Sequence, residues 1–496
     1  MDEFKRQLYV AAQVREMDRR TIERTGISGY TLMQRASAAT FNALREHWPQ
    51  ARTIAILCGS ANNRGGGYGV ARLAKASKLD VTLWQFGIPG RGDTVRGARE
   101  AWIADGGTIA EWPERGASLD RFDVIIDLIF GSGLSRTPPM SVRNAITAVA
   151  AARAGGSGVL AVDIPSGLAA DTGLILGASI VADVTVTFIC NKLELYIGDG
   201  PDCTGTVTYA SLDAPVEGFA DLVPHARLMD RTDLAAALPR RARTAHKGSN
   251  GHVLIVGGDS GMAGSVLLAG RAALRAGAGL VTVATRKEHV AMLTAAQPEI
   301  MFRGVERADE LTPLLTRAAT VAIGPGLGQH DWGRALWAAA REHNALVVDA
   351  DALNMLADSS DRNENWILTP NPSEAARLLG VKARDVQSDR ITAVGALRSH
   401  YGGITVLKGA GSLVAGEIPW LCRYGNSGMS VDGMGDVLTG IIAGLRAQGL
   451  DGERAAHIGV LAHALAGDQA AANGARGLLP SDLLAELRQI VNPVAS

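Results

Sequence analysis

Residues 425–449 read GNSGMSVDGMGDVLTGIIAGLRAQG, a stretch that predicts a glycine-rich turn opening a buried helix. The apolar residues after Asp436 recur at helical spacing: Val437, Leu438, Ile441, Ile442 and Leu445. The first N–H groups of a helix have no partner inside it, and the helix dipole is positive at that end. Gly433 and Gly435 would let a ligand approach the backbone closely. The pattern therefore predicts a phosphate-binding helix N-terminus with a carboxylate beside it.

The carboxylate of Asp436 would repel a bound phosphate, so its place beside the phosphate site calls for an explanation. Removing a proton from an attacking hydroxyl is such an explanation, and it makes Asp436 a candidate general base. The simpler alternative is that Asp436 only caps the helix. A short Gly-x-Gly-Asp pattern does not decide between the two, so the rest of the chain has to.

The chain is too long, at 496 residues, for one hydrophobic core, and two or three domains are expected. Hydrophobic residues make up 47% of it and glycine occurs 59 times, which suits closely packed α/β layers with many tight turns. A net charge of −1 attracts neither nucleic acid nor an anionic membrane, and an aromatic content of 5% disfavours a base-stacking surface. We therefore expect no nucleic-acid or membrane partner.

The N-terminus and the cysteines indicate a cytoplasmic protein. MDEFKRQLYV contains no apolar core of signal-peptide length, and no apolar run in the chain is long enough to span a bilayer. No two cysteines form a C-x-x-C pair, so structural zinc is not expected, and buried free thiols in a reducing compartment are. The cysteines are Cys58, Cys190, Cys203 and Cys422.

The N-terminal half alternates buried strands with helices. Strands are predicted at 52–58, 81–86, 122–127 and 158–163. A glycine-rich loop at 59–69 follows the first strand and leads into a helix, which is a mononucleotide-binding arrangement. Because ligands bind outside the carboxyl ends of parallel strands, Asp127, Asp163, Ser166 and the loop around Asn63 should meet in one crevice. The alternative is that strand-end aspartates merely cap turns.

The C-terminal half repeats this organisation. Strands are predicted at 252–256, 279–284, 319–323, 346–349, 366–368 and 404–408, most of them ending in glycine or polar turns. Lys408 and the glycine loop after it suit nucleotide phosphates, and a surface lysine is the alternative. With a linker near 213–228, we expect domains at 1–222 and 223–496. The fold class is α/β, with two doubly wound three-layer domains.

The N-terminal half, over about residues 8–212, resembles the epimerase domain of the NAD(P)H-hydrate repair enzymes. Val162-Asp-Ile-Pro-Ser-Gly-Leu168, the glycine loop and a strand running into Lys192 carry the resemblance. It implies a Rossmann-like fold and a potassium site at Asn63, Asp127 and Ser166. It also implies a hydrate pocket made of Asn62, Asn63, Arg64, Gly65, Gly66, Gly131, Ser132, Gly133, Leu134, Ser135, Arg136, Thr137 and Asp163.

Four positions depart from that family's pattern. The family's Gly-Gly-Asp in the first loop is Arg64-Gly-Gly66 here, Ala169 replaces an aspartate, and Glu194 replaces a glycine. The pocket thus loses a carboxylate and gains an arginine, which would either block the ligand or grip a phosphate. We expect this half to fold, keep its crevice and epimerise poorly or not at all.

The C-terminal half, over about 229–494, resembles the dehydratase domain of the same enzymes, which is ribokinase-like. The motifs are His246-Lys-Gly248, the stretch 270–283, Gly324-Pro-Gly-Leu-Gly328, Leu407-Lys-Gly-Ala-Gly411 and the stretch quoted first. The resemblance implies nucleotide binding at Lys408, Gly409, Ala410, Gly411, Ser412 and Gly435, and hydrate contacts at Ser265, Gly326, Asn371 and Asp436. Ser265, Asn371 and Met434 stand where the family usually has alanine, histidine and a small residue.

The activity implied is dehydration of the (S)-hydrate of NADH or NADPH with ADP (or ATP), Mg²⁺ and, in the N-terminal half, K⁺. The partner would be this small-molecule substrate, and the chain would form a homo-oligomer. Two alternatives remain open at the level of sequence. A small-molecule kinase of the same fold would use the same Asp436, and the N-terminal half could be a non-catalytic binding or oligomerisation module.

Overall fold

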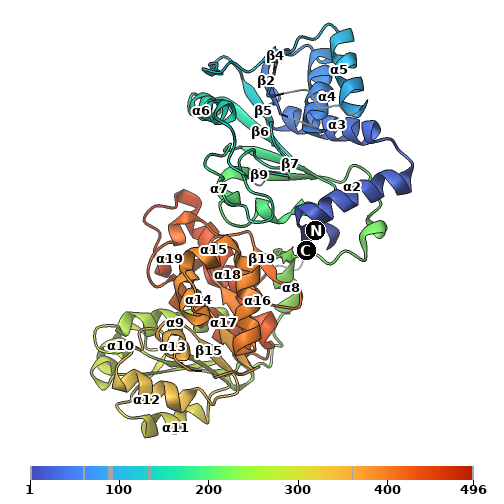
Figure 1. The fold of residues 1–496 in the computed structure, drawn as a ribbon. Helices are drawn as coiled ribbons and strands as arrows, with labels where there is room; N and C mark the ends of the chain where they lie inside the picture. Colours follow the sequence, from blue (N-terminus) through green and yellow to red (C-terminus); the bar gives the residue numbers. More distant parts are fainter. Residues whose placement is uncertain are drawn as a thin grey trace. The chain divides into compact units, whose positions relative to one another are not determined.

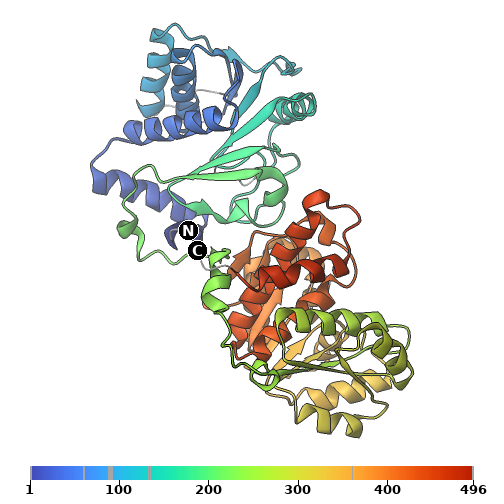
Figure 2. The same cartoon turned by 180° about the vertical axis from the view of Figure 1, so that it is seen from behind.

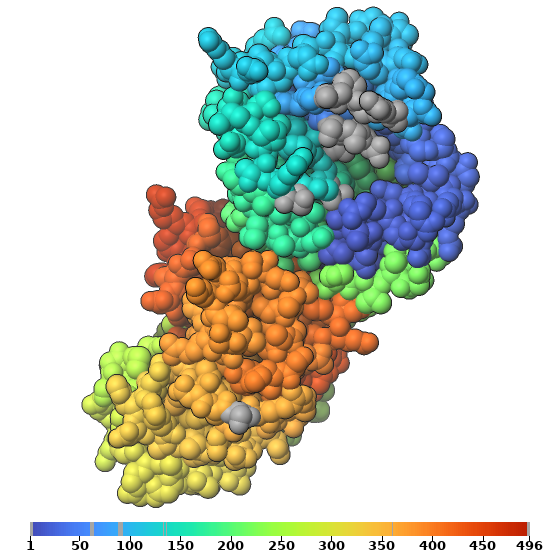
Figure 3. All heavy atoms as spheres, viewed as in Figure 1, coloured from blue at the N-terminus to red at the C-terminus, as the bar shows by residue number. Residues whose placement is uncertain are grey.

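A computed structural model describes residues 3–59, 62–87, 93–131, 133–134, 136–359 and 361–493, with only the backbone of residues 62 and 63. The chain forms two compact units, Asp2–Ala226 and Arg227–Ser496. Each unit is built from one stretch of chain, as the unmixed colours of Figures 1 and 3 show. Within the described residues, no helix is long and apolar enough to cross a membrane.

The N-terminal unit holds a parallel sheet that is seven-stranded in the described residues, in the order β4-β3-β2-β5-β6-β7-β9. The order reverses between β2 and β5, and such a switch point opens a crevice at the carboxyl ends of the strands. The predicted doubly wound sheet is confirmed. The strands are β2 (Thr53–Cys58), β3 (Asp80–Gln85), β4 (Ala110–Glu111), β5 (Val124–Leu128), β6 (Gly158–Val162), β7 (Val184–Phe188) and β9 (Thr206–Ala210), beside a short parallel pair, β1 (Gln7–Tyr9) and β8 (Asn191–Lys192).

Both faces of this sheet are covered, which is why its strands are apolar almost throughout. Ile54 and Ile56 of β2 pack toward α3, α4 and α5, whereas Ala55 and Leu57 pack toward α6 (Figure 1). The helices are α1 (Glu3–Arg6), α2 (Ala11–Thr25), α3 (Gly29–His47), α4 (Asn62–Ala76), α5 (Asp93–Ala104), α6 (Met140–Ala154) and α7 (Gly200–Thr204).

Helix α4 starts inside the stretch expected to be a loop, so the loop predicted over 59–69 is wrong from residue 62 onward. The reason is packing. A Cβ on Gly65 would lie 2.3 Å from Met33 Sδ on α3, and one on Gly67 would lie 2.2 Å from Cys58 Sγ on β2. These glycines let the helix approach its neighbours, and they do not mark an irregular loop.

The C-terminal unit holds a mixed sheet in the order β13-β12-β11-β14-β15-β16-β17-β18-β19-β10. Its strands from β13 to β17 are parallel, β18 is antiparallel to both neighbours, and the order reverses between β11 and β14. The strands are β10 (Ala226–Leu228), β11 (His252–Val256), β12 (Leu280–Thr285), β13 (Met301–Gly304), β14 (Thr320–Ile323), β15 (Leu346–Val348), β16 (Trp366–Leu368), β17 (Ile404–Leu407), β18 (Ser412–Val414) and β19 (Trp420–Cys422).

Helices α9, α17, α18 and α19 share one large core in this unit (Figures 1 and 2). Helix α17 contains the predicted apolar residues, and it lies directly on α9: a Cβ on Gly440 would be 2.1 Å from the Ala269 carbonyl oxygen. The helices are α8 (Thr232–Ala237), α9 (Ala263–Ala276), α10 (Val290–Ala296), α11 (Ala308–Leu315), α12 (Asp331–Ala340), α13 (Ala350–Leu356), α14 (Pro372–Leu379), α15 (Ala383–Ser388), α16 (Arg390–Tyr401), α17 (Met434–Ala447), α18 (Gly452–Ala470) and α19 (Pro480–Ile490).

Candidate functional site

Asp436 lies half-buried in the first turn of α17, just after Gly433, whose φ of 91° belongs to the left-handed region that glycine adopts freely. Burial and the charge of Asp349 raise the pKa of the Asp436 carboxyl to about 7, against an opposing hydrogen bond from Ser265. A carboxyl that titrates near neutral pH is well suited to take up a proton.

Lys408 follows β17 and is largely buried at the centre of the unit's carboxyl edge. Its Nζ lies 2.8 Å from Asp349 Oδ1 and 3.7 Å from Glu374 Oε2. The other oxygen of Asp349 accepts a hydrogen bond of 2.7 Å from Thr439 Oγ1 on α17. A Cβ on Gly435 would lie 3.2 Å from Lys408 Nζ, so the lysine reaches the glycine turn. The lysine therefore faces the site, and the surface-lysine alternative does not describe it.

A buried arginine holds the loop that follows Lys408. Arg390 donates hydrogen bonds to the carbonyl oxygens of Leu407 at 3.2 Å, Lys408 at 3.2 Å and Gly411 at 3.4 Å. The N–H groups of residues 409–411 have no acceptor among the described residues. A turn whose carbonyls are occupied and whose N–H groups are free is suited to an anion.

Ser265 and Gly326, two predicted hydrate contacts, lie together beside Asp436. Ser265 is on α9 and donates a hydrogen bond toward Asp436. Gly326 follows β14 with a φ of 55°, and a Cβ there would lie 3.3 Å from Ser265 Cβ and 2.8 Å from Met262 Cβ. The loops after β11 and β14 therefore meet at the switch point of the sheet.

Asn371 is the N-cap of α14. Its Oδ1 accepts hydrogen bonds of 2.9 Å from the N–H groups of Ser373 and Glu374, and Glu374 Oε2 accepts one of 2.7 Å from the Asn371 N–H. The same Glu374 oxygen lies near Lys408, so the capping box is part of the site. The cap occupies the Asn371 oxygen and leaves its NH₂ group to face a ligand.

Asp349, Glu374 and Thr439 belong to this cluster but were not predicted as site residues. Two sequence signals could have found them. Asp349 directly follows a buried strand, and Glu374 stands three residues after Asn371, which is the spacing of a capping box. Asp349 and Glu374 contact Lys408, and Thr439 contacts Asp349. These contacts form only when the segments after three strands meet a helix, which no local pattern reveals.

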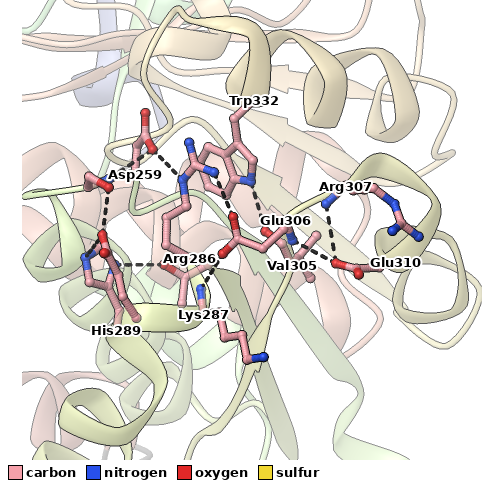
Figure 4. Close-up of polar contacts among 12 residues, drawn as sticks. Asp259, Arg286, Lys287, His289, Val305, Glu306, Arg307, Glu310 and Trp332 are labelled. Atoms are coloured by element: carbon pink, nitrogen blue, oxygen red, sulfur yellow. Dashed lines mark hydrogen bonds and ion pairs between the residues drawn. The ribbon is translucent and has the colours of Figure 1, made fainter.

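The loop after β11 is anchored by an ion-pair network, shown in Figure 4. Arg286 Nε lies 2.7 Å from Asp259 Oδ1, its Nη1 lies 2.9 Å from Glu306 Oε2, and its guanidinium stacks 4.3 Å from the Trp332 ring centroid. Burial works against ionisation of Asp259, but the Arg286 hydrogen bond and charge keep the pKa of that carboxyl below its usual range. The Asp259 N–H donates to the Gly326 carbonyl at 2.7 Å, which ties the network to the hydrate contacts.

The N-terminal unit contains a cavity of about 380 Å³ at the carboxyl ends of β5, β6 and β7. Its wall is mostly apolar, and includes Leu32 and Met33 of α3. Its polar lining includes Asp163, Lys192 and Asp18, and Gly66 lies at its edge. An apolar cavity with a few convergent polar groups is the usual form of a small-molecule site.

Asp163 and Lys192 form an ion pair of 2.7 Å in this cavity. Lys192 is fully buried and also donates to Thr187 Oγ1 at 2.8 Å. Burial works to lower the pKa of Lys192, but Asp163 holds it above its usual value. Asp163 has a φ of 73°, which a non-glycine residue rarely adopts and which is typical of functional sites.

Arg64, which was expected in the hydrate pocket, does not line the cavity. It is fully buried and donates to the carbonyl oxygens of Gly59 at 2.6 Å, Phe86, and Gly87 at 3.1 Å. It therefore joins the segments that follow β2 and β3. Of the other predicted pocket residues, Ser132, Ser135 and the side chains of Asn62 and Asn63 lie outside the described residues, and Gly65, Gly131, Gly133, Leu134, Arg136 and Thr137 do not line the cavity as described.

Asp127 and Ser166, two of the predicted cation ligands, are buried and bonded to each other. Ser166 donates from Oγ to Asp127 Oδ1 at 2.6 Å and from N to Oδ2 at 2.7 Å. Burial raises the pKa of Asp127 to about 6, and no ion pair joins it to a described cationic group. A buried carboxylate and hydroxyl without a basic partner form a donor set that fits a hard cation.

Glu194, which replaces a glycine of the family, is fully buried near the ion pair. Neither of its carboxyl oxygens has a hydrogen-bond partner among the described residues. Burial raises the pKa of Glu194 to about 7, while Lys192 opposes this. The four cysteines are all buried free thiols, as predicted.

Comparison with protein families supports the resemblance that each half of the chain shows. A family model described as "NAD(P)H-hydrate dehydratase" matches residues 253–489, and one described as "YjeF-related protein N-terminus" matches residues 29–194. A ribokinase-like protein of Enterococcus faecalis is 26% identical with a TM-score of 0.51, covering 54% of this chain and 96% of its own. The ribokinase-like fold of the C-terminal unit is thus confirmed.

Two further relatives carry descriptive names. An ADP/ATP-dependent NAD(P)H-hydrate dehydratase of Bacillus subtilis, co-crystallised with ATP and Mg²⁺, is 27% identical with a TM-score of 0.48, covering 55% of this chain and 99% of its own. A bifunctional NAD(P)H-hydrate repair enzyme of Coxiella burnetii is 44% identical over 494 residues, covering 98% of this chain and 99% of its own. With that identity over nearly the whole length of both proteins, the chain belongs to the family of bifunctional NAD(P)H-hydrate repair enzymes.

Proposed function

We propose that the C-terminal unit dehydrates the (S)-hydrate of NADH or NADPH, with ADP or ATP as the phosphate donor. The observation that carries this is the position of the Asp436 carboxyl. It accepts a hydrogen bond from Ser265 and feels the charge of Lys408, and Ser265 lies beside Gly326. Ser265 and Gly326 are the hydrate contacts in this proposal. One group of atoms therefore combines a base, a place for the hydrate and an anion-binding turn.

The chemistry follows from the weakness of hydroxide as a leaving group. Asp436 takes the proton of the ring hydroxyl while the hydroxyl oxygen attacks the terminal phosphate, held at the N-terminus of α17. The bond between the ring carbon and the phosphorylated oxygen then breaks with electron push from the ring nitrogen, and inorganic phosphate leaves. Loss of a proton from the neighbouring ring carbon completes the dehydration and restores the reduced nicotinamide.

The nucleotide would be held by Lys408, the loop Gly409–Ser412 and Gly435. The free N–H groups of that loop suit its phosphates. Mg²⁺, when bound, would neutralise charge on the nucleotide phosphates. Glu374, which lies near Lys408, is the carboxylate that would hold it.

For the N-terminal unit we propose epimerisation of the (R)- and (S)-hydrates, with K⁺ held by Asp127, Ser166 and Asn63. The cavity and its Asp163–Lys192 pair support the proposal. Weak epimerisation stays a prediction, but one of its reasons changes, since Arg64 holds backbone carbonyls outside the cavity. The expected homo-oligomer and cytoplasmic location also stay predictions.

The test supplies the purified (S)-hydrate and ADP to the full chain and follows the absorbance of the reduced nicotinamide. Recovery of that absorbance, with release of AMP and phosphate, supports the dehydratase. A stable phosphorylated hydrate without recovery would instead identify a kinase of the same fold. Purified (R)-hydrate, followed by chromatography without nucleotide, tests the epimerase separately.

A further inference from the structure

Asp18 places a second carboxyl in the cavity of the N-terminal unit, and no motif in the sequence points to it. We propose that Asp18 is a catalytic acid of epimerisation that protonates the departing hydroxyl of the hydrate, while Asp163 acts as the base. The proposal rests on the epimerase function proposed above and names a residue for it.

Asp18 lies on the face of α2 that lines the cavity, and its side chain is exposed there. Val14, Asp18 and Ile22 stand four residues apart, so they share one face of the helix, and all three line the cavity. An aspartate thus takes the middle place of an apolar stripe. Two glutamates of the same helix, by contrast, are paired: Glu16 and Glu23 both bind Arg19.

Asp18 has no hydrogen-bond or ion-pair partner among the described residues. Its side chain stays accessible, as a group that must touch a substrate has to be. The protein atoms crowded around it displace water, and this desolvation raises the pKa of Asp18 to about 6. Of the charged groups that face it, Lys192 works against this rise and Asp163 adds to it.

The two carboxyls of the cavity therefore differ in their surroundings. Asp163 lies 2.7 Å from the buried ammonium of Lys192. Asp18 has no such contact and retains its proton more readily. Two carboxyls in one site, one paired with a cation and one unpaired, have the different surroundings that suit a base and an acid.

The chemistry of the hydrate needs such a pair. Its hydroxyl is bonded to a carbon next to the ring nitrogen. When Asp18 protonates that oxygen, the C–O bond breaks, water is released and the nitrogen lone pair forms a planar C=N⁺ bond. Water then adds to the other face as Asp163 takes its proton. The proton returns from Asp163 to Asp18 through solvent, so atoms and charge balance.

The experiment compares Asp18→Asn, Asp18→Glu and Asp163→Asn with Glu23→Gln in the full chain. Glu23 is a carboxylate of the same helix outside the cavity, so it is the matched control. Conversion of purified (R)-hydrate to (S)-hydrate is followed by chromatography, and dehydration of (S)-hydrate with ADP reports on the other unit. Circular dichroism and thermal unfolding show whether each variant folds.

We expect Asp18→Asn to slow epimerisation by about 10²–10⁴-fold, Asp18→Glu to recover part of the rate and Glu23→Gln to leave it unchanged. The wild-type rate should also fall as the pH rises through about 6, a limb that Asp18→Asn lacks. Normal epimerisation by a folded Asp18→Asn chain, with loss in Asp163→Asn, would overturn the role of Asp18 and leave the epimerase standing. A wild-type chain without any epimerisation, which is the other outcome left open by the sequence, would overturn both proposals.

Discussion

At the scale of single residues, the two units use buried charge in opposite ways. In the C-terminal site the Lys408 ammonium is shared by two carboxylates, Asp349 and Glu374. In the N-terminal unit Glu194 is buried with no hydrogen-bond partner among the described residues. A buried carboxyl is stable only if it is paired or protonated, so these residues should respond differently to mutation and to pH.

Asp436→Asn should lower kcat for dehydration by about 10²–10⁴-fold and leave ADP affinity nearly unchanged, because the amide cannot accept the proton. In the wild type, kcat/KM should rise as the pH passes through about 7, where Asp436 ionises. Asp432→Asn is the control, since Asp432 is an exposed carboxylate of the same stretch. An Asp436→Asn variant that keeps most of its turnover would remove Asp436 from the mechanism.

Lys408→Ala should weaken ADP binding, measured by calorimetry, because it deletes a charge-assisted contact to phosphate. It should also destabilise the C-terminal unit by about 3–5 kcal/mol, since Asp349 is left buried without its cation. The double variant Lys408→Ala with Asp349→Asn should regain stability but not ADP affinity. Equal recovery of both would mean that Lys408 serves the fold alone.

Glu194→Gln should stabilise the N-terminal unit against urea at neutral pH. Because the folded-state pKa is raised from 4.5 to about 7, the wild type is most stable below pH 4.5 and loses stability as the pH rises to about 7. The glutamine variant lacks this loss. Its free energy of unfolding should therefore exceed that of the wild type by an amount that grows over that interval to the order of 3 kcal/mol. Glu217→Gln, at an exposed position of the same unit, should give a curve parallel to that of the wild type.

At the scale of secondary structure elements, the strands could be predicted from the sequence because sheets covered on both faces produce continuous apolar runs. The start of α4 could not, since a glycine that opens a loop and a glycine that admits a neighbouring side chain look alike in sequence. Turns that follow predicted strands pointed to Gly326 and Lys408 as candidate site residues. Asp18 and Asp349 were missed, because only the assembled fold brings Asp18 to the cavity and Asp349 to Lys408.

The contact between α9 and α17 tests whether a glycine is needed for close packing between helices. Gly440→Ala should destabilise the C-terminal unit by about 1–3 kcal/mol or more, because the new Cβ would lie 2.1 Å from the Ala269 carbonyl oxygen. Gly395→Ala, on the exposed side of α16 with no atom within 4 Å of its Cβ, should be neutral or stabilising by up to about 1 kcal/mol. Denaturant unfolding measures both, and equal effects would contradict the packing role of Gly440.

At the scale of the whole molecule, each unit has its own hydrophobic core and its own site at the carboxyl edge of its own sheet. Calorimetry should therefore resolve two unfolding transitions. ADP, which binds only the folded C-terminal unit in our proposal, should raise the midpoint of one of them by mass action. A single transition that shifts as a whole on adding ADP would show that the units unfold together.

The support of the glycine loop by Arg390 has a consequence for protein engineering. The arginine grips main-chain carbonyls, which every amino acid possesses, and not the side chains of the loop. Ala410 can therefore be randomised in a directed-evolution library without loosening the scaffold beneath it. In our proposal this loop binds the donor nucleotide, so selectivity for that nucleotide could be altered separately from stability, provided that Arg390 is kept constant.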